Sequence, residues 1–210
     1  MKKVIAAVGL LSLGFFFSGT AKAATPPHFF FGGYAETAHF LTYQGYGFGG
    51  EVGVQVSQLF SLVFEGATGT ATQNYDSKSQ YSTSNETIKL AMTPFIFSVH
   101  FTAPLGNHVQ PYVGVGIASW NLKLTDEYSY QSNYYPTDSY STSKTWKFNS
   151  IAPIFKIGLA VSLTPNVWIV GEYRQIVAKD KLKNTSDYAT SESDVYFGSA
   201  DLKLGIRIVI

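Results

Sequence analysis

Residues that could form a hydrolase or acyltransferase site are few and scattered in this sequence. Such a site needs a serine nucleophile with a histidine base within reach. None of the four histidines (His28, His39, His100 and His108) is followed two residues later by serine. Asp-Ser pairs occur at 76–77 and 138–139, in serine-rich segments where chance produces them easily. The sequence contains no H-E-x-x-H motif and no phosphate-binding glycine loop. We therefore predict no enzyme activity, no catalytic residue, no cofactor and no metal site.

A second set of chemically capable residues consists of ten acids and bases placed along segments of alternating polarity. Opposite charges that share an interior are expected to form ion pairs, because a single buried charge is very costly. The acids are Glu36, Glu51, Glu65, Glu172 and Asp201, and the bases are Lys89, Lys156, Arg174, Lys203 and Arg207. His100 is a further candidate. Five acids against five bases predict a balanced network.

The composition narrows the class of protein. The chain has 210 residues, of which 45% are hydrophobic and only 14% charged, with a net charge of +1 and no cysteine. A typical soluble domain has roughly 25% charged residues. The values exclude a disordered chain and a disulfide scaffold, and they give no reason to expect a nucleic-acid partner. Beyond the N-terminus, no apolar run approaches the roughly 20 residues of a spanning helix.

The N-terminus has the three parts of a secretory signal peptide. Met1-Lys2-Lys3 is basic, residues 4–17 are apolar, and Ala21-Lys22-Ala23 is an A-x-A cleavage pattern. We predict a signal peptide over residues 1–23 and one exported domain over residues 24–210.

The exported domain alternates between apolar and polar residues with a period of two, which is typical of strands that have one apolar and one polar face. We predict eight strands near residues 29–40, 48–57, 60–72, 87–102, 110–125, 146–164, 167–179 and 195–210. Short turns alternate with long loops at 73–86, 126–145 and 180–194. This arrangement and the even number of strands predict a closed, all-β, up-and-down antiparallel barrel.

In two predicted strands, the apolar residues switch midway between even-numbered and odd-numbered positions, which we call a change of phase. In 87–102, the apolar set passes from Leu90 and Met92 to Phe95 and Phe97, and 110–125 changes in the same way. One extra residue in each strand would explain the change, so we predict bulges near Thr93-Pro94 and Ala118-Ser119.

Alternation does not by itself say which face is inside, since a soluble eight-stranded barrel such as a lipocalin turns its apolar face inward. Here the polar stripe consists mostly of small residues, which suit a crowded interior. The apolar stripe is bulky and has no charge at its centre, and a Lys or Arg facing mid-bilayer lipid costs about 2–4 kcal/mol. Aromatic residues gather at the strand ends, as in membrane girdles. We therefore predict a transmembrane barrel with its apolar face outward.

Three segments carry a family resemblance. Residues 110–116 read Q-P-Y-V-G-V-G, residues 163–166 read L-T-P-N and lead to G-E-Y-R at 171–174, and the chain ends in K-L-G-I-R-I-V-I. On these motifs the chain resembles the OmpA-type, opacity-like family of eight-stranded outer-membrane β-barrels. The resemblance implies a bacterial outer-membrane location and contact with outer-membrane lipid and lipopolysaccharide. It also implies recognition of the C-terminal strand by the barrel-assembly machinery, although Ile210 stands where that signal has an aromatic residue.

Three functions are compatible with such a barrel. A salt-bridged interior predicts a structural, membrane-integrity role, because an eight-stranded barrel has just enough room for its side chains. The alternative is a small gated pore with Glu172, Arg174 and Lys203 as gate charges, and a lipid A-modifying enzyme is the remaining class. Adhesion or ligand contact is expected at the surface loops, whose candidate residues are Tyr128, Tyr130, Tyr134, Tyr135 and Tyr140.

Overall fold

A computed structural model describes residues 28–40, 43–103, 105, 108–135, 138–186 and 189–210, with side chains described for all of these except 38–40, 43, 178–186 and 189–198. The predicted signal peptide lies outside the described residues. The strands are β1 (His28–Phe40), β2 (Tyr43–Gln55), β3 (Phe60–Lys78), β4 (Ser82–Thr102), β5 (Val109–Ser132), β6 (Tyr140–Thr164), β7 (Val167–Ser186) and β8 (Ala189–Val209). Among the described residues no helix has the length and hydropathy that a helical membrane span requires.

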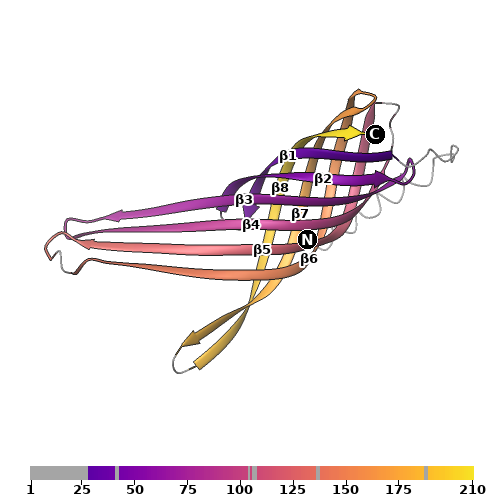
Figure 1. Cartoon of the computed structure of the whole chain (residues 1–210). Helices are drawn as coiled ribbons and strands as arrows, with labels where there is room; N and C mark the ends of the chain where they lie inside the picture. The colour runs from indigo at the N-terminus through magenta and orange to yellow at the C-terminus, as the bar shows by residue number, and fades with distance from the viewer. Residues whose placement is uncertain (1–27, 41–42, 104, 106–107, 136–137, 187–188) are drawn as a thin grey trace, which may run out of the picture.

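The eight strands form a closed antiparallel barrel in which each strand pairs with its neighbours in sequence. The ring is closed by β1 and β8, whose register runs from Phe30↔Val209 to Phe40↔Ser199 (Figure 1). The predicted all-β barrel is confirmed, and no edge of the ring is left open where all eight strands pair.

The apolar residues face outward over the fully paired part of the barrel. On β8, Leu204 is 66% exposed and Ile206 is 56% exposed, whereas Asp201 and Lys203 are buried. The other strands alternate in the same way, with Phe31, Phe64 and Phe155 on the outside. This is the orientation predicted for a barrel in lipid and the inverse of a soluble barrel.

The long loops of the prediction are wrong, because most of their residues continue the strands. β3 runs on to Lys78, β5 to Ser132 and β7 to Ser186, and each partner strand begins within a few residues. Threonine and tyrosine favour strands, and the segments pair with each other residue by residue. Polarity on one face of these segments makes them resemble loops, although they are paired strands.

These extensions divide at the hairpin end of the barrel. Pairing between β6 and β7 ends at Ile154↔Ile176, and pairing between β2 and β3 ends at Gly45↔Ala71. Beyond these points β3–β6 continue as a four-stranded sheet and β7–β8 as a separate hairpin, as Figure 1 shows. We call the β3–β6 part, residues 72–78, 82–89, 123–132 and 140–147, the external sheet.

The two predicted bulges are also wrong. The β4–β5 register is continuous from Ser82↔Ser132 to Thr102↔Tyr112, and Pro94 lies in it without a shift. The apolar residues Leu90 and Met92 instead face the barrel interior. The change of phase in the sequence therefore marks a change in the chemistry of the interior, from polar to apolar. A register shift occurs between β6 and β7 at Ser162/Thr164, beside a short turn.

Candidate functional site in the barrel lumen

Strand register brings nine of the ten predicted charged residues into the lumen. The acids Glu36, Glu51 and Glu65 lie on β1, β2 and β3, where Glu51 pairs directly with Glu65. The bases lie on β6–β8, where Lys156 pairs with Arg174. These three acids on one wall therefore face bases on the opposite wall, which also carries the acids Glu172 and Asp201. The nine are Glu36, Glu51, Glu65, Lys156, Glu172, Arg174, Asp201, Lys203 and Arg207, and their side chains are at most 11% exposed.

Lys203 is the centre of this network. Its Nζ lies 2.7 Å from a carboxylate oxygen of Glu51, 3.1 Å from one of Glu65 and 3.7 Å from one of Glu172. It also lies 4.1 Å from the centre of the Tyr34 ring. One ammonium on β8 thus contacts a carboxylate on the neighbouring β7 and, across the lumen, carboxylates on β2 and β3. The aromatic face adds a cation–π contact.

The other three bases extend the network along the barrel axis. Arg174 forms an ion pair with Glu36, and its Nε donates to Asp201 at 2.9 Å. Lys156 forms an ion pair with Glu65. At the short-turn end, Arg207 Nε donates to Glu51 at 2.7 Å. The result is an alternating chain of acids and bases that holds opposite walls together.

Two tyrosines and one histidine complete the site, and the charge pattern alone did not identify the tyrosines. Tyr112 donates its hydroxyl to Glu172 at 2.7 Å, and its ring stacks on His100 with centroids 4.7 Å apart. His100 Nε2 lies 3.1 Å from the Ser98 hydroxyl. The sequence feature that could have indicated these tyrosines is glycine at inward-facing positions of the strands. A Cβ on Gly158 would collide with the Tyr112 ring, and one on Gly49 would lie 2.6 Å from Tyr34. Each glycine therefore leaves room for an inward tyrosine.

The prediction for Lys89 is wrong. Its side chain is 51% exposed on the outside of β4 and forms an ion pair with Glu127 at 2.7 Å. The reason is the missing bulge, since the continuous register turns Leu90 inward and Lys89 outward. The described lumen therefore holds five acids and four bases, so the balance expected from the sequence is off by one negative charge.

An apolar cluster fills the interior above the charged network, toward the hairpin end. Ile96, Ile154 and Ile176 are each at most 1% exposed and pack with larger side chains. The remaining buried members are Ala71, Leu90, Met92, Ala118, Trp120, Leu122, Phe148 and Ala152. Water and ions would have to cross both this cluster and the charges below it.

Glu65, His100 and Glu172 are the described residues whose ligand atoms are arranged as a metal could require, all within 4.8 Å of one another. Their carboxylates are already engaged, however. Glu65 contacts Lys156 and Lys203, and Glu172 accepts the Tyr112 hydroxyl. Ammonium groups beside these oxygens oppose a second cation, so the cluster is part of the ion-pair network.

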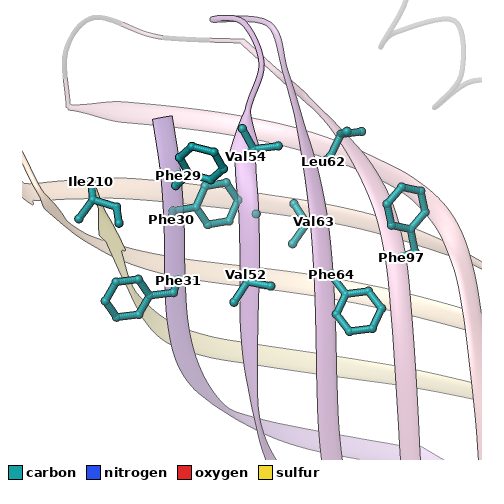
Figure 2. A pocket seen from close by; sticks show the side chains of 11 residues that line it. Phe29, Phe30, Phe31, Val52, Val54, Leu62, Val63, Phe64, Phe97 and Ile210 are labelled. Atoms are coloured by element: carbon teal, nitrogen blue, oxygen red, sulfur yellow. The ribbon is translucent and has the colours of Figure 1, made fainter. Parts of the chain in front are cut away.

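The described residues also form an apolar hollow of about 500 Å³ near the short-turn end (Figure 2). Its outward lining includes Phe31, Val52, Phe64 and Phe97 on four neighbouring strands. The side chains that line this hollow are all apolar, so it is a feature of the wall and not a chemical site.

The predicted surface tyrosines lie at the far end of the external sheet. Tyr128 and Tyr130 are on β5 and Tyr140 is on β6, and Tyr134 and Tyr135 lie between these strands. The Tyr140 ring lies 5.9 Å from that of Tyr128 and 5.4 Å from that of Tyr130. The structure thus brings three of the five into contact. The side chain of His39 lies outside the described part of the chain.

Comparison with known proteins identifies the architecture. The sequence profile described as the outer membrane protein beta-barrel domain matches residues 8–202. No curated protein matches the chain.

The chain is similar to the outer membrane protein AlkL, solved in DMPC lipid bilayers, at 12% identity and a TM-score of 0.54, over 92% of this chain and 95% of AlkL. It is also similar to OprG from Pseudomonas aeruginosa, at 10% identity and a TM-score of 0.52, over 89% of this chain and 97% of OprG. A major outer membrane protein from Thermus thermophilus matches at 14% identity and a TM-score of 0.49, over 89% of this chain and 100% of that protein. At these identities the likeness concerns the fold.

Proposed function

Because the chain belongs to the outer membrane protein beta-barrel domain family, and is located in the bacterial outer membrane, we propose that it is a non-conducting structural barrel. In this proposal it contributes to membrane integrity, and its external sheet makes contact with ligands or other surfaces outside the cell. The short turns then face the periplasm and the hairpins face outward, as in other barrels of this kind.

The observation that carries this proposal is the double closure of the lumen. The ion pairs of Lys203 and Arg174 cross the interior, and the apolar cluster around Ile154 lies above them. An ion would have to break several of these contacts at once and then enter an apolar layer, where an unpaired charge is very costly.

Conductance tests the proposal directly. We expect the full-length protein, reconstituted in planar lipid bilayers, to give no reproducible single-channel steps. Insertion is checked by the change in gel migration on boiling. Reproducible steps from the inserted barrel would overturn the non-conducting role.

A second candidate, a small gated pore, is favoured by the excess acid in the described lumen. Five acids against four bases would favour cations, with Glu172, Arg174 and Lys203 as gate charges. In that case steps should be cation-selective, and Glu172→Gln or Lys203→Met should change their size or frequency. Absence of steps in both the original protein and these variants would reject the pore.

The structural role and the external contacts have separate tests. Cells without the protein are expected to become more sensitive to detergent, and the original gene should restore resistance. A barrel lacking residues 128–142 should still restore resistance but should lose contact with external surfaces. We also infer contact of the outer wall with lipid and lipopolysaccharide, and recognition of the strand ending at Ile210 by the assembly machinery.

A further inference from the structure

The external sheet has two faces of different chemistry. Successive residues of a strand point to opposite faces, so the inward set on β5 continues from Trp120 and Leu122 through Asp126 to Tyr128 and Tyr130. We call this side the inner face. The opposite face carries Lys89, Lys123, Thr125 and Glu127, which are polar or charged.

Tyrosines form a stripe on the inner face. The register places Tyr75, Glu86, Tyr128 and Thr142 in one row across the four strands, and Tyr130 pairs with Tyr140 in the next row toward the tip. We define the tyrosine stripe as Tyr75, Tyr128, Tyr130 and Tyr140. Tyr75 is 46% exposed and Tyr140 is 55% exposed, so ring faces of the stripe are available to a ligand.

The sheet holds the stripe rigidly because its two hairpin tips are bonded together. Asn133 donates its backbone N–H to the Tyr81 carbonyl at 2.9 Å, and its amide donates to the Gln80 carbonyl at 3.2 Å. The rings of Tyr81 and Tyr134 lie 5.7 Å apart across the same junction. A preformed aromatic surface loses little conformational entropy when it binds a ligand.

Two buried acceptor atoms lie at the barrel end of the stripe. Gln73 Oε1 and Asp126 Oδ1 receive no hydrogen bond from the described residues. They belong to one row of the sheet, Gln73, Ile88, Asp126 and Lys144. Buried acceptors normally have a donor, and a ligand with hydroxyl groups would supply one to each.

The charge of the inner face indicates which hydroxyl-rich ligand fits. Among its described residues within the external sheet, the charged side chains are Glu86, Asp126 and Lys144, which is one more acid than base. This balance disfavours a sulfated or other anionic polysaccharide, since like charges repel. Apolar ring faces beside acceptor oxygens suit a sugar, whose C–H faces are apolar and whose hydroxyls donate.

We propose that the inner face of the external sheet binds a neutral oligosaccharide, with sugar rings on the tyrosine stripe and hydroxyls donating to Gln73 and Asp126. The proposal rests on the external contact role proposed above and names its ligand class. The ligand is expected to lie along the sheet, from the tip toward the barrel.

Binding to defined oligosaccharides tests the proposal. The full-length chain is placed in lipid nanodiscs and titrated calorimetrically with maltohexaose, cellohexaose, chitohexaose and a heparin hexasaccharide. We expect at least one neutral hexaose to bind and the heparin fragment not to bind. No binding of any neutral hexaose, or stronger binding of the heparin fragment, would overturn the proposal.

Variants locate the site and distinguish stacking from hydrogen bonding. Tyr128→Ala with Tyr140→Ala should weaken binding about tenfold or more, and Asp126→Ala about tenfold, because each removes a direct contact. Tyr128→Phe should keep most of the affinity. Tyr46→Ala is the matched control, since Tyr46 is 78% exposed on the outer side of β2.

Folding is checked for each variant by gel migration before boiling, and Asp126→Ala keeps the test valid if the double variant does not fold. A folded double variant that binds like the original protein would overturn the proposal. Conductance steps would overturn the proposed structural role without affecting this result. If the barrel is non-conducting and contacts external surfaces but binds no neutral hexaose, only the proposed ligand class, a neutral oligosaccharide, is overturned.

Discussion

The interior of the barrel consists of two regions with opposite chemistry. Toward the short-turn end, nine charged side chains are linked by ion pairs around Lys203 and Arg174. Toward the hairpin end, Ile96, Ile154 and Ile176 pack with aromatic and aliphatic side chains. Three strands, β3, β6 and β7, supply both regions, and β6 contributes Lys156 to one and Ile154 to the other.

The change of chemistry coincides with a change in the wall. Where the charges lie, all eight strands pair, and acids on β1–β3 attract bases on β6–β8 across a closed ring. The apolar cluster reaches the level at which β6 and β7 stop pairing, at Ile154↔Ile176. Ion pairs are directional and suit a wall whose geometry is fixed, whereas apolar packing tolerates a wall that opens. The comparison suggests that each region matches the rigidity of its wall.

Removal of Arg174 should give the largest loss of stability. Arg174 contacts Glu36, Asp201 and Glu65, so Arg174→Met leaves buried carboxylates without their shared base. Breaking a buried pair in this way costs about 3–5 kcal/mol. Urea unfolding in lipid vesicles measures the free energy of unfolding. Arg174→Lys, which keeps the charge but not the fork of donors, should lose less. Equal losses for both variants would contradict the role of the fork.

Truncation in the apolar region should cost less. Ile154→Ala leaves a cavity in the cluster, and such changes cost about 2–5 kcal/mol. We expect the low end of this range, because the wall opens beside Ile154 and lets the site relax. Ile157→Ala on the same strand is the matched control, since Ile157 is 51% exposed on the lipid side. An equal loss of unfolding free energy for the two variants would show that the cluster is not a packed core.

Much of the barrel could be predicted from the sequence because lipid and a crowded lumen impose different side chains on alternate residues. Leu204 and Lys203 are an example, with one exposed and the other buried. The turn at Pro165-Asn166 was also predictable, and β6 ends at Thr164 and β7 begins at Val167 on either side of it. Glu51 and Lys203 could be assigned to the lumen from phase alone, but their partners depend on strand register across the ring, which a single strand does not encode.

The external half could not be predicted in the same way, because the rule that the interior is polar stops holding there. Leu90 and Trp120 are apolar and inward, so the assumption of a uniformly polar interior required bulges that the structure does not contain. The polar composition of residues 126–145 predicts a loop, yet Tyr128 and Tyr130 pair with β4 and β6. Exposed hairpins and loops share a composition, and only the pairing partner distinguishes them.

Lys89 should give the smallest effect, and it separates the outside of the barrel from the lumen. Its ion pair with Glu127 is about half exposed, and such pairs contribute no more than about 1 kcal/mol. Lys89→Met should therefore leave the free energy of unfolding nearly unchanged, and added salt should remove any remaining difference. Lys156→Met, on a buried lysine that pairs with Glu65, is the matched comparison and should cost several times more. A loss at Lys89 as large as that at Lys156 would place Lys89 in the lumen, restore the balance of five acids and five bases, and remove the excess negative charge on which the cation-selective pore depends.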